Sequence, residues 1–201
     1  MTKLIIPADL VNHLKDGGAL KSHEVESVYE ALLKREQDSD VHNLLRALAM
    51  SSPPIPAYRK LAEDVLRERR EDWWVQGALY ALCYEWNIVS PYLSELKELI
   101  QVSSWAQFSN SAITAFSILG KHLYVTQDPD LYRVILSLVD EDTKLGIGSS
   151  ENYWQVHLEA ALAALDEGIR GPESLINPME IRTPLEIPSN LLKIARERAG
   201  R

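Results

Sequence analysis

The sequence predicts an all-α protein: a right-handed α-solenoid, or superhelix, of about four antiparallel helix hairpins with a capping helix at each end. Two observations indicate this fold. Apolar residues recur at helical spacing along most of the chain, and the apolar/polar alternation typical of β-strands is almost absent. A short Ala/Leu pattern also returns at a fixed interval, as in repeat proteins whose units bury their apolar faces against one another.

The repeated pattern is a five-residue, largely apolar segment. It occurs at residues 44–48, again 34 residues later at 78–82, and after another 34 residues at 112–116. A fourth copy at 161–165 follows only after 49 residues, because the segment 140–150, rich in Gly, Ser and Asp, is predicted to form a longer loop. We expect each copy to lie on the second helix of a hairpin and to form part of a continuous buried seam.

A first helix is predicted before each copy, and three of these first helices carry a proline at the entrance, where the backbone N–H has no intrahelical partner. The predicted hairpins pair residues 23–37 with 40–51, 56–70 with 72–87, 91–101 with 104–123, and 129–141 with 150–168. We expect a single domain made of an N-terminal cap over residues 1–22, the hairpins over 23–168, and a Pro-rich extended segment with a C-terminal helix over 169–201.

The second helices share a motif: a large apolar residue, then Ala four positions later, a second Ala three further on, and Leu or Phe directly after it. Two of them match it fully, with Trp74, Ala78, Ala81 and Leu82, and with Phe108, Ala112, Ala115 and Phe116. This motif resembles the second helix of HEAT-like repeats, and the resemblance covers about residues 23–168. The resemblance implies an α-solenoid whose second helices line a concave groove.

Two departures from the HEAT pattern leave a second repeat family open. The arginine usual early in the second helix is replaced, and a unit of 34 residues is short for HEAT. The tetratricopeptide repeat has this period, but Leu66 and Arg69 stand where its first-helix signature has small or aromatic residues. The HEAT-like interpretation is therefore favoured, and both families imply the same architecture.

Composition restricts the partners and the compartment. A formal net charge of −8 disfavours binding to nucleic acid or to an anionic membrane and favours a basic protein partner. The single cysteine, Cys83, excludes an internal disulfide and fits a reducing compartment. The apolar run before Pro7 is too short for a signal peptide, and no stretch approaches the length of a membrane span. We therefore expect a cytoplasmic protein.

The chain carries no recognisable catalytic, cofactor or metal motif. None of its histidines has a second histidine three or four residues away, and no P-loop, Rossmann or nucleophile-elbow signature is present. The segment 140–151 has acids at the first, third and twelfth places of an EF-hand loop, but Lys144 and Leu145 occupy the places of a ligand and of the required glycine. We expect no cofactor, no metal and no enzymatic activity.

The candidate binding residues lie opposite the buried seam. At 100° per residue, this face of the second helices consists mainly of hydrogen-bonding side chains, interrupted by three large aromatic residues. The predicted partner-binding residues are Trp73, Gln76, Tyr80, Tyr84, Gln107, Asn110, Thr114, Glu159, His42 and Arg46. Exposed Trp and Tyr are frequent interface anchors, although the termini or a neighbouring helix could instead cover these rings.

These features favour a non-enzymatic protein-binding module. In its length, acidity and lack of catalytic motifs, the chain is similar to small helical immunity proteins, which bind and neutralise a basic bacterial toxin domain. The alternative is a scaffold or regulatory adaptor that binds a peptide or a helix in its groove. A HEAT-like enzyme acting on nucleic acid ranks third, because Arg46 is the only cation on the expected inner face.

Overall fold

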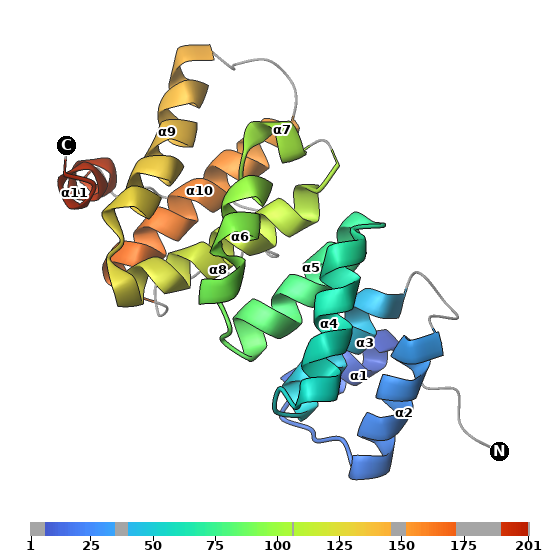
Figure 1. Ribbon diagram of the computed structural model, residues 1–201. Helices are drawn as coiled ribbons and strands as arrows, with labels where there is room; N and C mark the ends of the chain where they lie inside the picture. The colour runs from blue at the N-terminus through green and yellow to red at the C-terminus, as the bar shows by residue number, and fades with distance from the viewer. Residues whose placement is uncertain (1–6, 35–39, 106, 146–151, 172–189, 201) are drawn as a thin grey trace. The chain divides into compact units, whose positions relative to one another are not determined.

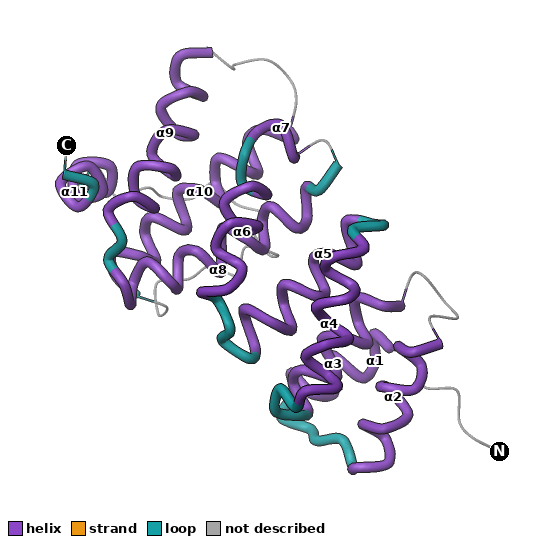
Figure 2. Tube along the Cα trace, viewed as in Figure 1, coloured by secondary structure: helices purple, strands orange, loops and turns teal. Residues whose placement is uncertain are grey.

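The computed structural model describes residues 7–34, 40–105, 107–145, 152–171 and 190–200. All regular structure in these ranges is helical, and no strand occurs in them (Figure 2). The prediction of an all-α fold is therefore confirmed. None of the described helices is long and apolar enough to cross a bilayer. The chain divides into two compact units, Met1–Tyr92 and Leu93–Arg201, and the expected single domain stays a prediction.

The first unit is built around α3 and α5. Its elements are α1 (Pro7–Lys15), α2 (Ser22–Lys34), α3 (Val41–Ser51), α4 (Pro56–Glu68), α5 (Asp72–Leu79), the π-helical turn η2 (Tyr80–Glu85) that continues α5, and the 3-10 turn η3 (Ser90–Tyr92). Helix α3 packs against α1, α2, α5 and η2, while α4 packs against α5 and η2 (Figure 1). The expected pairs α2 with α3 and α4 with α5 are therefore in contact.

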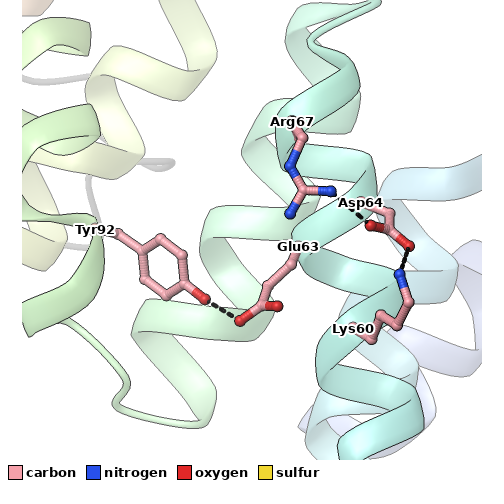
Figure 3. Close-up of polar contacts among 5 residues, drawn as sticks. All are labelled: Lys60, Glu63, Asp64, Arg67 and Tyr92. Atoms are coloured by element: carbon pink, nitrogen blue, oxygen red, sulfur yellow. Dashed lines mark hydrogen bonds and ion pairs between the residues drawn. The ribbon is translucent and has the colours of Figure 1, made fainter.

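Helix α4 shows how local sequence places these elements. It begins at Pro56, and the ion pair between Lys60 Nζ and Asp64 Oδ2, 2.8 Å apart, spans one turn on its surface. The hydroxyl of Tyr92 donates a 2.6 Å hydrogen bond to Glu63 Oε1, and this bond holds η3 against α4 (Figure 3). A residue 29 positions later in the chain thus ties the end of the unit to this helix.

The buried seam of the first unit contains the repeated segments 44–48 and 78–82. Ala78, Leu79 and Leu82 are fully buried, as are most of their counterparts on α3. The two helices approach closely at Gly77, where an added Cβ would lie 2.8 Å from the Cα of His42. Only a residue without a side chain fits at this distance, so Gly77 sets the separation of α3 and α5.

The second unit is centred on α8. Its helices are α6 (Leu93–Leu99), α7 (Val102–Trp105), α8 (Ser109–Thr126), α9 (Pro129–Leu145), α10 (Asn152–Arg170) and α11 (Leu191–Arg198). Helix α8 packs against α6, α7 and α10, and α9 packs against α10 (Figure 1). A second close approach occurs here, because a Cβ on Gly120 would lie 3.0 Å from the Cα of Ala164.

Helix α11 is held by side-chain bonds to backbone carbonyls as well as by packing on α9 and α10. Arg198 Nη1 donates hydrogen bonds of 2.9 Å to the carbonyl of Gly168 and to the hydroxyl of Tyr132. Arg133 Nε donates to the carbonyl of Ala199 at 3.1 Å. Helix α11 is thus tied to the end of α10, and its role as a cap of a helical stack stays a prediction.

The predicted loop over residues 140–150 is wrong in its first half, because α9 continues to Leu145. The physical reason is that no Gly or Pro interrupts the chain between Pro129 and Gly146, so nothing ends the helix earlier. The first half of the EF-hand-like segment is therefore helical. Residues 146–151 and the Pro-rich segment 172–189 lie outside the described residues.

Glu167 is a fully buried acid in the contact between α8 and α10. Its Oε2 would lie 2.7 Å from a Cβ on Gly120, and neither carboxyl oxygen has a hydrogen-bond partner among the described residues. Burial raises the pKa of Glu167 to about 7, against the opposing effect of the positive charge of Lys121. The fold therefore favours the neutral form of this acid more than water does.

We predict that Glu167→Gln removes a pH dependence of stability. Because the folded pKa is raised, the acid stabilises the fold fully below its unfolded pKa of 4.5, and this contribution is lost as the pH rises through about 7. The loss is about 3 kcal/mol in the free energy of unfolding. Urea denaturation between pH 4 and 8 measures it, with the exposed Glu197→Gln as control. An unchanged pH dependence in Glu167→Gln would show that the acid is solvated.

Candidate functional site

Five of the predicted binding residues form one continuous row of contacts, here called the aromatic ladder: Trp73, His42, Arg46, Tyr80 and Tyr84. The rings of Trp73 and His42 meet edge to face, with centroids 5.6 Å apart. Arg46 Nη1 lies 3.4 Å from His42 Nε2, and the guanidinium carbon of Arg46 lies 4.3 Å from the centroid of the Tyr80 ring. Tyr80 stacks on Tyr84 at 4.8 Å and 18°.

The ladder is built from α3 on one side and from α5 with η2 on the other. His42 and Arg46 lie one turn apart on α3, whereas the aromatic residues lie on α5 and η2. Side chains from the two helices can interleave because Gly77 allows α3 and α5 to approach closely beside His42. Gly77 is not among the predicted functional residues, although a glycine inside a helical pattern is a signal of close backbone approach.

Both tyrosines of the ladder lie on the π-helical turn η2. Trp86 N bonds to the carbonyl of Ala81 at 3.1 Å, five residues earlier, which is the π-helical pattern. Glu85, at the end of this turn, interacts with the hydroxyl of Tyr80 and raises its pKa, whereas Arg46 acts on the same hydroxyl in the opposite direction. The indole of Trp86 also donates a 2.9 Å hydrogen bond to the carbonyl of Ser52, which secures the end of η2 against the end of α3.

The electrostatics of the ladder keep His42 neutral. The pKa of His42 is lowered to about 4, mainly by burial and then by the charge of Arg46. A backbone hydrogen bond at Trp73 and the charge of Asp72 raise this pKa, but their effect is smaller. A guanidinium can only donate, so the Nε2 of His42 accepts from Arg46. Burial and the Glu85 hydrogen bond raise the pKa of Tyr80 well above its usual value, so its hydroxyl also stays protonated.

The ladder reaches the surface at Trp73. This indole is 50% exposed, so the described part of the chain leaves it uncovered. Arg46, Tyr80 and Tyr84 are half-buried. The arrangement therefore offers an aromatic anchor beside a fixed cation, which suits recognition of a partner.

Three residues predicted to face solvent are instead buried: His42, Gln76 and Thr114 are 8%, 1% and 7% exposed. The helical wheel treats one face of each second helix as free, but the second helices within each unit pack side by side and leave little of that face open. His42 and Gln76 lie where α3 meets α5. The middle of α8 is buried on nearly all sides between α6, α7 and α10, and Thr114 lies there.

The remaining predicted residues belong to the second unit and are not part of the ladder. Gln107 is exposed, while Asn110 and Glu159 are half-buried. A polar contact that sequence spacing did not reveal lies near them, where Ser109 Oγ is 3.3 Å from Nε2 of the fully buried His157. It joins α8 to α10 across 48 residues. The roles of these residues in binding stay predictions.

The described residues contain no group of three or more His, Cys, Asp or Glu side chains that could hold a metal ion. Cys83 is buried on η2, and its Sγ lies 3.6 Å from the carbonyl of Ile88. It therefore packs as part of the helix and does not face solvent.

We predict that replacing Trp74 by Ala destabilises the fold much more than replacing its neighbour Trp73 by Ala. Trp74 is 1% exposed and Trp73 is 50% exposed. Trp74→Ala should lower the free energy of unfolding by about 3–5 kcal/mol, because it leaves a large cavity in the core. Trp73→Ala should cost less than about 1 kcal/mol. Urea denaturation followed by circular dichroism measures both, and equal losses would place Trp73 in the core.

We predict that His42 titrates with a midpoint near pH 4, measured from its ring-proton shifts by NMR. Because this folded pKa is lowered, the neutral ring stabilises the fold above the unfolded pKa of 6.5, and about 3 kcal/mol is lost as the pH falls through 4. His42→Gln should remove this loss, whereas the exposed His23→Gln should not. A midpoint near 6.5 would mean that the ring is solvated.

Comparison with known proteins gave no match for this chain, either to a protein-family model, to a curated protein or to a solved structure. The HEAT-like resemblance therefore depends on the sequence motif of the second helices alone.

Proposed function

We propose that this chain is a non-enzymatic protein-binding module and that the aromatic ladder is its contact surface. The half-exposed indole of Trp73 carries this proposal. It contacts His42, and the row continues into Arg46 and the stacked tyrosines. Trp, Tyr and Arg are the residues most enriched among interface hot spots, and here their side chains are already ordered before binding.

We propose further that the helices form a HEAT-like, right-handed α-solenoid with second helices on the inside. The packing of α3 on α5 and of α8 on α10 supports this order within each unit. On the side of the first helices, the rings of Tyr29 on α2 and Tyr58 on α4 lie 4.9 Å apart. The ladder then lies on second helices, where a groove of this kind would bind its partner.

In its narrower form, the proposal is an inhibitor or immunity protein that neutralises a basic bacterial toxin domain in the cytoplasm. The net charge of −8 supports it, because an acidic protein attracts a basic partner over long range and speeds association. The single, buried cysteine fits a reducing compartment. An adaptor that binds a helix through apolar contacts is the second candidate, and the exposed Trp73 favours it equally.

We predict that Trp73→Ala weakens binding of the partner captured from the source cells at least about 30-fold, as expected for loss of a hot-spot anchor of about 2 kcal/mol or more. Tyr124→Ala is the matched control, because Tyr124 is 46% exposed but lies outside the ladder. Affinity purification identifies the partner, and calorimetry compares the variants. Equal affinity of both variants would contradict the proposal.

The same partner distinguishes the two narrower functions. A toxin should arrest growth when it is expressed alone, and co-expression of this chain should restore growth. Its affinity should also fall steeply with salt, whereas an apolar helix should bind an adaptor with little salt dependence.

A further inference from the structure

We propose that Arg46 recognises a carboxylate of the bound protein, so that the ladder accepts a segment with an Asp or Glu side chain next to an apolar one. This inference rests on the proposed function, because it names what the ladder binds. The apolar side chain would cover the indole of Trp73, and the acid would pair with the guanidinium of Arg46.

The guanidinium of Arg46 is held in a defined position. Its carbon lies 4.3 Å from the centroid of the Tyr80 ring, and Tyr80 is itself held by stacking on Tyr84. The Nη1 of Arg46 faces His42 Nε2 at 3.4 Å. Arg46 also interacts with the hydroxyl of Tyr80. A guanidinium has five N–H donors in a rigid plane, so these contacts leave donors for a further partner.

The charge of Arg46 is not balanced by an ion pair within the described part of the chain. Among the described residues no carboxylate lies within ion-pair distance of it, and its buried Nε has no hydrogen-bond partner there. Glu85, at the end of η2, interacts with the hydroxyl of Tyr80, as Arg46 does, but it forms no ion pair with Arg46. Other arginines of the chain do have acid partners, in the pairs Arg59–Glu63, Arg67–Asp64, Arg133–Asp130, Arg170–Asp166 and Arg196–Asp140.

A single carboxylate fits this site better than a polyanion does. The chain has 29 acidic and 21 basic residues, so it repels a nucleic acid or a phosphate-rich surface. One carboxylate matches the planar edge of one guanidinium in a bidentate pair. The aromatic neighbours of Arg46 reduce access of water and so strengthen that pair. The net charge of the chain would attract a basic partner over long range. One carboxylate of that partner would then pair with Arg46 and fix the position of the bound segment.

The test uses phage-displayed random 12-residue peptides as the probe. Selection on the wild-type chain should enrich Asp or Glu beside an aromatic or aliphatic residue, and selection on Arg46→Glu should enrich Lys or Arg at that position. In a selected synthetic peptide, replacing the acid by its amide should weaken binding to the wild-type chain about 10- to 100-fold. The same replacement should have no effect on binding to Arg46→Met.

Thermal denaturation of each variant checks that it is folded, and the amide peptide tests the wild-type chain without any protein variant. Peptides that need Trp73 but show no preference for an acid would overturn the inference and leave the proposed function standing. Peptides that bind Trp73→Ala as well as the wild-type chain, or a library that yields no binder, would overturn both.

Discussion

The contact of α3 with α5 at Gly77 is the constraint on which the candidate site depends. A Cβ at this position would lie 2.8 Å from the Cα of His42, so any other residue would force the helices apart. At the observed separation, two side chains of α3 reach between Trp73 of α5 and Tyr80 of η2. The ladder is therefore a property of the helix–helix distance and not of either helix alone.

This close contact also explains the unusual electrostatics. Burial where the two helices meet is the main reason that the pKa of His42 is lowered to about 4, which leaves a neutral ring able to accept from Arg46. Arg46 in turn lies over Tyr80 and forms no ion pair with a carboxylate of the described residues. In the second unit, the contact at Gly120 instead encloses the acid Glu167 and raises its pKa to about 7. Close helix approach thus favours the neutral form of a base in one unit and of an acid in the other.

The helices could be predicted from the sequence because apolar periodicity and the prolines at residues 56 and 129 are local signals. The burial of particular polar residues could not be predicted, because it depends on helices distant in sequence. Gln76 and Thr114 have polar side chains, yet neighbouring helices cover them. The π-helical turn was also unpredictable, since the contact of Trp86 with Ser52 accompanies it from 34 residues away. An ideal helical wheel places Trp73, Tyr80 and Tyr84 on one face, but the contacts of Trp73 and Tyr80 with α3 are visible only in the structure.

The most direct measurement is of the nuclear Overhauser effects between the rings of His42 and Trp73, compared in the wild-type chain and in Gly77→Ala. With ring centroids 5.6 Å apart, edge protons are close enough for cross-peaks in the wild-type chain. If Gly77 sets the distance between α3 and α5, the added methyl group should abolish these cross-peaks while the chain remains helical. Cross-peaks of equal strength in Gly77→Ala, or none in the wild-type chain, would contradict this role of Gly77.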